Sequence, residues 1–179
     1  MSADQKPEKI IAPENYAIYP LARQIAARHV ESVLHFLNDI PMKTYTWEEV
    51  LAESRPDRKY YGKWDHSLIA FDRHKPIAVL IAYERETEAH PCYRDNSIYI
   101  SELAVDKTYR RKGIAKEMLN LFFQRSSRFL YLEGEPVYTI QTNAAAWNEP
   151  VKKLYEACGY KTVGTKKYPD RNDVIMKKQ

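Results

Sequence analysis

The sequence predicts a single domain of the α/β (α+β) class. Three observations support this fold class. The chain has 179 residues, which is enough for one hydrophobic core and barely enough for two. Hydrophobic residues make up 44% and charged residues 29%, as in an ordinary soluble globular protein. Segments with helical apolar spacing alternate with short continuous apolar runs, which are typical of buried strands.

The N-terminal third is predicted to contain a tail, a strand and two helices. Residues 1–15 are polar and include two prolines, so we expect a flexible tail there and a domain spanning residues 16–179. A short first strand is expected over residues 16–21. Apolar residues at helical spacing predict a helix over residues 23–38. A second helix is expected over roughly residues 46–56, with two glutamates in its first turn.

The rest of the chain predicts a regular succession of strands and helices. Two apolar runs joined by a short polar link predict a hairpin, and the strands after it are separated by amphipathic segments. Gly159 follows the last of these segments, as a left-handed glycine at a helix C-terminus commonly does. The expected elements are strands 67–71, 77–83 and 97–105, helix 113–126, strand 137–142, helix 149–158, and strands 160–168 and 173–176.

Composition disfavours several classes of protein. No apolar run is long enough to span a bilayer, and no secretory signal is visible over residues 1–9. Two cysteines cannot form a disulfide framework, which favours a cytoplasmic protein with reduced thiols. None of the five histidines stands at metal-ligand spacing from another ligand, so no metal is expected.

The net charge of +4 is spread unevenly along the chain. Residues 107–128 contain seven basic residues and one acidic residue, so this segment is strongly positive while the rest is slightly negative. Such a local excess favours an anionic ligand near the segment. The alternative interpretation is a solvated basic helix face.

A glycine within this basic segment stands where a strand is predicted to give way to a helix. The strand ends at Val105, and Gly113 opens the helix. Backbone N–H groups at a helix start are unpaired and bind phosphate oxygens, and glycine lets a ligand approach the backbone closely. Arg110, Arg111 and Lys112 would add charge around a pyrophosphate or a ribose phosphate. Alternatively, Gly113 only relieves backbone strain.

Two segments resemble the GCN5-related N-acetyltransferase (GNAT) superfamily. Arg110-x-x-Gly113-x-Ala115, after a strand ending in Leu-Ala-Val, is similar to the family signature R/Q-x-x-G-x-G/A. Asn148 stands seven residues before Tyr155 and is followed by Gly159-Tyr160, which is similar to the family segment N…LYE…GF. One motif alone would be weak evidence, but the pair occurs in the family's order. Together the two segments cover roughly residues 98–160.

The resemblance implies a mixed, mostly antiparallel sheet flanked by helices, with two splayed parallel strands at its centre. It also implies an activity that uses acetyl-CoA as cosubstrate. Amides at the helix start would hold the pyrophosphate of CoA, and the end of the preceding strand would pair with the pantetheine arm. Tyr155 would protonate the leaving thiolate. The residues implied in binding acetyl-CoA are Leu103, Ala104, Val105, Arg110, Arg111, Lys112, Gly113, Ile114, Ala115 and Asn148.

Each implied role has a structural alternative. Asn148 precedes Glu149 and Pro150, an ordinary helix start, so its side chain could serve only as an N-cap. Tyr155 lies on the apolar stripe of its helix and could belong to the core, although its place in the second motif favours the catalytic role. Cys158 lies on the same stripe and is interpreted as core packing.

The general base departs from the family pattern. Many members carry a glutamate on the strand before the second motif, where this chain has Gln141 and Asn143, neither of which accepts a proton. The candidate is therefore Glu102. By strand alternation Glu102 would share a face with Ile98 and Ile100, an unusual place for a carboxylate. Either a β-bulge turns it toward a cleft, or it is held in a partly dry site.

The resulting hypothesis is direct transfer of an acetyl group from acetyl-CoA to an amine. The acceptor could be a small metabolite, an antibiotic, a peptide N-terminus or a lysine, because no motif marks the acceptor surface. One alternative is a catalytically idle acyl-CoA sensor. Another is a nucleic-acid-binding module that uses Tyr109 for stacking, which the mild net charge disfavours. We therefore expect an amine acceptor, no nucleic acid and no membrane as partners, with homodimerisation left open.

Overall fold

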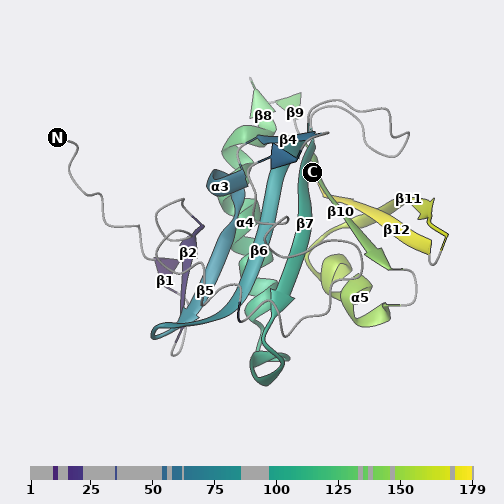
Figure 1. The fold of residues 1–179 in the computed structure, drawn as a ribbon. Coiled ribbons are helices and arrows are strands. Elements are labelled where there is room, and N and C mark those ends of the chain that lie inside the picture. Colours follow the sequence, from purple (N-terminus) through teal and green to yellow (C-terminus); the bar gives the residue numbers. More distant parts are fainter. Residues whose placement is uncertain are drawn as a thin grey trace.

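The computed structural model describes residues 10–11, 16–21, 35, 54–55, 58–61, 63–85, 97–132, 135–136, 139–145, 148–169 and 172–178. Within these residues, ten strands form one sheet and two more form a separate pair (Figure 1). The main path of the large sheet runs β1-β2-β5-β6-β7-β10-β12-β11. Helices α4 and α5 lie between its strands in sequence, as expected for a mixed α/β domain.

The first half of the sheet follows the predicted pattern. The short strand, the hairpin and the long strand expected from the sequence are all present, and the hairpin turn is reduced to Arg73 and His74. These strands are β2 (Ala17–Pro20), β5 (Leu68–Asp72), β6 (Lys75–Arg85) and β7 (Ser97–Val105). Three short elements were not predicted: β3 (Ser54–Arg55), β4 (Arg58–Tyr61) and α3 (Lys63–His66).

The second half also matches, with shifted boundaries. The predicted helix 113–126 extends four residues further, and the short pair β8–β9 follows it. The elements are a 3₁₀ turn (Lys107–Tyr109), α4 (Ile114–Leu130), β8 (Tyr131–Leu132), β9 (Glu135–Pro136), β10 (Thr139–Ala145), α5 (Glu149–Ala157), β11 (Lys161–Lys167) and β12 (Asn172–Lys178).

The N-terminal predictions are only partly covered. The helix predicted over residues 23–38 lies outside the described residues, apart from His35, which is helical. Of the helix predicted over roughly residues 46–56, the described part, Ser54–Arg55, is instead strand β3, which pairs with β4. Arg55 precedes Pro56, and a residue before proline favours extended backbone over helix. Within the segment expected to be a tail, Ile10–Ile11 form strand β1. They pair antiparallel with β2, with Ile10 opposite Ile18. Their β-branched side chains favour this extended pairing, so this part of the segment is more ordered than predicted.

The central strands diverge, as the family resemblance implies. β7 and β10 run parallel, whereas the other pairs of the described sheet are antiparallel. Their pairing starts at Ser97–Thr139 and stops at Ile100–Thr142. β7 then continues to Val105 and β10 to Ala145 without pairing to each other. In Figure 1 the two strands separate toward α5.

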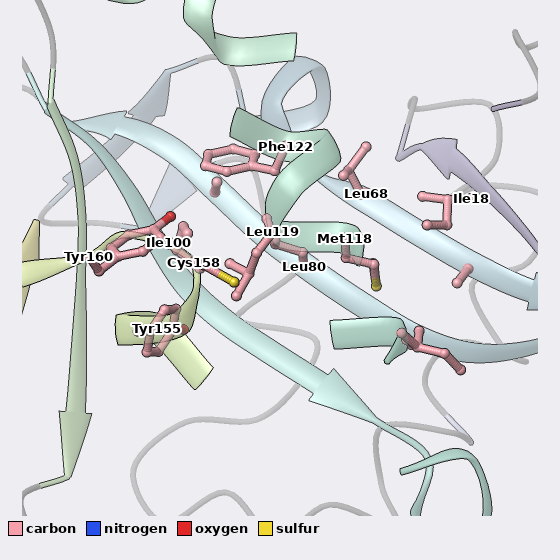
Figure 2. Close-up of a cluster of buried hydrophobic side chains, with 14 of the residues drawn as sticks. Ile18, Leu68, Leu80, Ile100, Met118, Leu119, Phe122, Tyr155, Cys158 and Tyr160 are labelled. Atoms are coloured by element: carbon pink, nitrogen blue, oxygen red, sulfur yellow. The ribbon is translucent and has the colours of Figure 1, made fainter. Parts of the chain in front are cut away.

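One face of the sheet carries the main core. The apolar stripe of α4, which includes Ile114, Met118 and Phe122, packs into a cluster with residues of β5, β6 and β7 (Figure 2). Burying a side chain of this size stabilises the fold by roughly 1.5–3 kcal/mol. α5 contributes Tyr155 and Cys158 to the same cluster. None of the helices described here combines the length and apolar character needed to cross a bilayer.

Candidate functional site

A β-bulge lies at the point where the central strands separate. Ile100 stands opposite Ala82 of β6, but Glu102 stands opposite Ile81, the very next residue of β6. Ser101 is therefore an extra residue in β7. Its hydroxyl donates a hydrogen bond of 3.4 Å to the carbonyl of Ile81, which supports the distorted backbone.

The bulge changes the faces to which the following side chains point. Residues opposite each other in a ladder share a face, so Leu103 stays with Leu80 on the α4 face. Glu102 instead shares the opposite face with Ile81. Simple alternation, which would put Glu102 beside Ile100, is therefore wrong, and the bulge alternative is the one observed. Glu102 is half-buried there.

The same face carries an aromatic pair next to Glu102. Tyr83 and Tyr99 stand opposite each other on β6 and β7, with ring centroids 5.7 Å apart in an edge-to-face arrangement. The side chain of Tyr83 is buried, whereas that of Tyr99 is partly exposed. Glu102 therefore lies beside ring surface that lowers the local polarity without closing the site to solvent.

The end of β7 presents backbone groups to the gap between the strands. The N–H of Asp106 donates to the carbonyl of Ile77 at 2.8 Å, so the backbone of Asp106 faces β6. Backbone groups alternate along a strand, which makes Ala104 face β6 as well and turns Leu103 and Val105 toward the gap. The carbonyl of Val105 accepts a hydrogen bond of 2.9 Å from Nε of Arg110.

The loop after β7 is tied to the β5–β6 hairpin. Asp106 caps the 3₁₀ turn by accepting 2.8 and 2.7 Å hydrogen bonds from the N–H and hydroxyl of Thr108, and pairs with Lys75 at 2.8 Å. Burial alone would raise the pKa of Asp106, but the bonds from Lys75 and Thr108 outweigh it and lower the pKa to about 2. Tyr109 donates a 2.6 Å hydrogen bond to Asp72. These contacts fix the position from which the basic residues extend.

The turn that opens α4 contains two residues with positive φ angles. Arg111 and Gly113 have positive φ angles of 62° and 85°, and the carbonyl of Gly113 accepts the N–H of Glu117 at 3.0 Å. A Cβ placed on Gly113 would meet no atom within 4 Å, so the space above this backbone is open. Arg110, Arg111 and Lys112 are all exposed around it. The positive φ explains why glycine occupies position 113, and the open space would also admit a ligand.

A hydrogen bond also connects the first turn of α4 to the residue that precedes β2. The hydroxyl of Tyr16, just before β2, donates a short hydrogen bond to the carboxylate of Glu117. Burial and this bond raise the pKa of Tyr16 well above its usual value. The bond holds the acidic side chain of the first helical turn against Tyr16.

Asn148 is the N-cap of α5. Its Oδ1 accepts a 3.4 Å hydrogen bond from the N–H of Val151, and Pro150 occupies the first turn. The capping interpretation from the sequence is therefore observed. Contact between Asn148 and pantetheine stays a prediction.

The end of α5 places two tyrosines against each other. Gly159 has a φ of 86°, which confirms the predicted left-handed glycine at the end of the helix. The N–H of Tyr160 donates to the carbonyl of Tyr155 at 3.0 Å, which completes a Schellman motif. The rings of Tyr155 and Tyr160 meet edge to face with centroids 5.1 Å apart. Cys158 is buried in the same cluster, as predicted, and burial raises the pKa of its thiol.

The two predicted catalytic residues lie on opposite faces of the sheet. Tyr155 is 3% exposed and belongs to the cluster on the α4 face together with Ile100. Glu102 lies on the other face of β7. Sequence reasoning did not identify Ser101, although the misplaced carboxylate in Ile98-x-Ile100-x-Glu102 was the signal of the bulge. The side chains of β10 lie outside the described part of the structure.

Comparison with known families identifies the fold. The acetyltransferase (GNAT) family matches residues 34–160, which is more than half of the chain. The chain belongs to this acetyltransferase family. A comparison with curated proteins finds no match.

Solved structures with the same fold include several GNAT acetyltransferases. Naa50 of Arabidopsis thaliana, solved with the bisubstrate analogue CoA-Ac-MVNAL, has 14% identity and a TM-score of 0.67, covering 92% of this chain and 99% of that chain. The Arabidopsis thaliana NAA60 complex with acetyl-CoA has 20% identity and a TM-score of 0.61, covering 91% and 98%. The ribosomal-protein-S18-alanine N-acetyltransferase of Escherichia coli has 18% identity and a TM-score of 0.61, covering 90% and 92%.

Proposed function

We propose that this GNAT chain is an N-acetyltransferase that moves an acetyl group from acetyl-CoA to a primary amine by direct attack. The observation that carries the proposal is the arrangement along β7. This strand leaves β10 after Ile100, bulges at Ser101, and ends at a basic loop that opens α4 at Gly113. β7 thus connects three features: the half-buried carboxylate of Glu102, backbone groups that face the gap, and the turn at residues 111–115. We call this turn the cradle, because its amides would hold a phosphate group.

Acetyl-CoA would lie along this strand. The amides from Arg111 to Ala115, including that of Ile114, would bind the pyrophosphate, helped by the exposed charges of Arg110 and Lys112. The backbone groups of Leu103 and the N–H of Val105 would pair with the pantetheine arm, while the carbonyl of Val105 accepts from Arg110. The backbone groups of Ala104 face β6, so Ala104 would lie beside the ligand without a hydrogen bond to it.

The chemistry would use both faces of the gap. Glu102, or a water that it holds, would take a proton from the acceptor ammonium, and the free amine would attack the thioester carbon. A backbone N–H of Leu103 or Val105 would stabilise the oxyanion as the C–N bond forms. The C–S bond would then break, and Tyr155 would supply a proton to the CoA thiolate. The newly acylated nitrogen would lose its second proton to solvent, from which the Tyr155 hydroxyl would be restored.

Peptide N-termini are the first acceptors to test. Naa50 was solved with an analogue that joins CoA to a peptide, and the enzyme from Escherichia coli is named for an alanine of a ribosomal protein. Small-molecule amines and lysine side chains complete the panel. The half-buried carboxylate Glu102 beside the Tyr83–Tyr99 pair would attract any cationic acceptor.

The test combines binding and turnover. Thermal shift with acetyl-CoA, with an oligonucleotide of similar charge as the comparison ligand, separates a CoA-binding protein from a nucleic-acid-binding module. A screen of amines by release of free CoA thiol then follows acetyl transfer. We expect stabilisation by acetyl-CoA alone and thiol release with at least one amine class. Binding without turnover on the whole panel would support the idle acyl-CoA sensor instead.

A further inference from the structure

The hydroxyl of Tyr160 is a buried polar group that the proposed reaction does not use. Tyr160 is 3% exposed, and within the part of the chain that the structure describes its hydroxyl has no hydrogen-bond partner. A buried donor without a partner destabilises a fold, so it is uncommon unless a ligand or a second state supplies the acceptor. Burial, and then the neighbouring Tyr155 and Cys158, raise the pKa of Tyr160, so its hydroxyl stays protonated and is available as a hydrogen-bond donor.

Packing alone does not account for the hydroxyl. The ring of Tyr160 contacts the ring of Tyr155 edge to face, and a phenylalanine would make the same contact. The family segment that this stretch resembles ends in Gly-Phe, whereas this chain has Gly159-Tyr160. The oxygen atom is therefore the feature that needs an explanation.

Tyr160 belongs to the same buried cluster as Ile100, the last residue of β7 that pairs with β10. It precedes β11, whose first residue, Lys161, continues through Lys177 of β12 and Gln141 of β10 to Tyr99 of β7 in one register row. The pairing of β7 with β10 ends at Ile100, one residue beyond that row. Figure 2 shows Tyr160 together with Ile100, Tyr155 and Cys158 in one part of the buried cluster.

The proposal rests on the proposed function, because it assigns a contact to the bound cosubstrate. We propose that the Tyr160 hydroxyl donates a hydrogen bond to a carbonyl oxygen of bound acyl-pantetheine, next to Tyr155 at the apex of the β7–β10 gap. The pantetheine–thioester chain brings amide and thioester carbonyls to an apolar region, and each of them needs a donor there. Tyr160 thereby becomes a binding residue that favours a carbonyl-bearing ligand at this depth.

The test is Tyr160→Phe, which removes only the oxygen atom. Because the hydroxyl lacks a partner in the free protein, the variant should be more stable, with Tm raised by roughly 2–8 °C. Because the bound ligand loses a hydrogen bond, the Kd for acetyl-CoA measured by calorimetry should rise about three- to tenfold. Stability and affinity should therefore change in opposite directions, which a purely structural role cannot produce.

Free CoA identifies the carbonyl that accepts the bond. If the acceptor is the thioester carbonyl, Tyr160→Phe weakens binding of acetyl-CoA but not of CoA, and if it is a pantetheine amide, both are weakened equally. Tyr19→Phe is the matched control, because Tyr19 lies on β2, where its ring meets Phe71 with centroids 6.2 Å apart. That variant should leave both affinities unchanged.

Two outcomes would overturn the inference. One is a Tyr160→Phe protein that binds acetyl-CoA and CoA as tightly as the wild type does. The other is a variant that melts at a lower temperature with unchanged binding, which would mean that the hydroxyl already has a partner in the free protein. Failure of the wild type itself to bind acetyl-CoA is a separate result, since it would contradict the proposed function before the variant is measured.

Discussion

Tyr155 packs in the buried core, and the proposed function also assigns it a proton transfer. Its ring is almost wholly buried and contacts Tyr160, so its loss would leave a cavity, but removal of the hydroxyl alone would not. A phenol has a reference pKa near 10 and is therefore protonated at neutral pH in an ordinary environment. The single oxygen atom is thus the part of the residue that separates the core interpretation from the catalytic one.

Tyr155→Phe should lower kcat and leave the Kd for acetyl-CoA nearly unchanged. The proton is needed only as the C–S bond breaks, so an interaction made in the transition state is lost while ground-state binding is kept. Steady-state kinetics with calorimetric binding measures both quantities. A lower Tm or weaker acetyl-CoA binding, with kcat preserved, would instead assign Tyr155 to the core.

Glu102→Gln should damage the reaction at the acceptor side. The carboxylate would remove the ammonium proton and attract the cation, so kcat should fall by about 10²–10⁴-fold and the acceptor KM should rise. Binding of acetyl-CoA should survive, because Glu102 points away from the α4 face on which the cradle begins. Higher pH should partly rescue the variant, since more of the acceptor is then already neutral. The measurement is a pH–rate profile of both proteins with the acceptor found in the screen.

Near-normal rates of Glu102→Gln across neutral pH would exclude Glu102 as the base. Ser101→Ala offers a matched comparison one residue away. It removes the 3.4 Å hydrogen bond to Ile81 at the bulge without removing a charge. A similar kinetic loss in that variant would show that the backbone shape, rather than the carboxylate, carries the effect.

At the scale of elements, the loop between β7 and α4 is built from local contacts that the sequence could reveal. The glycine, the basic residues and the acidic N-cap act within a few positions of one another, so short-range patterns predict the turn. The same holds for the glycine that ends α5. The bulge could not be predicted in this way. The alternation of side chains along a strand indicates that Glu102 would fall on the apolar face, but it does not identify which residue of β7 is the extra one.

Gly113→Asp and Gly113→Ala together test the cradle. Both introduce a Cβ at a φ of 85°, which lowers the free energy of unfolding by roughly 1–2 kcal/mol. Both Cβ atoms would lie in open space. Only the aspartate adds negative charge at the proposed pyrophosphate site. We therefore expect similar Tm losses in the two variants, with acetyl-CoA binding abolished by aspartate and weakened much less by alanine. If Gly113→Asp binds acetyl-CoA as tightly as the wild type does, the cradle does not bind the pyrophosphate.

At the scale of the whole molecule, the site depends on how distant segments meet. Glu102 and Tyr155 are separated in sequence by helix α4 and by strands β8, β9 and β10, and their placement on opposite faces of the sheet follows from the bulge and the divergence of β7 from β10. Neither feature is local. The sequence therefore predicted the order of most described elements, whereas the geometry of the site required the assembled sheet.

The two halves of the sheet meet through one short parallel pairing, between residues 97–100 and 139–142. A ligand seated in the gap beyond this pairing would add contacts to both halves. Binding to the folded state alone also stabilises it by mass action, by about 2.7 kcal/mol when the ligand is at 100 times Kd. Acetyl-CoA should therefore alter the amide hydrogen exchange of both halves rather than of the loop alone.

Hydrogen exchange along β7 gives this expectation an internal control. The amides of Leu103 and Val105 face the gap, whereas that of Ala104 faces β6, where pairing already protects it. Saturation with acetyl-CoA should slow exchange at Leu103 and Val105 much more than at Ala104, in addition to any uniform slowing from global stabilisation. Residue-resolved exchange by NMR can separate the three amides. Equal slowing at all three would mean that the ligand stabilises the fold from elsewhere and does not pair with this edge of β7.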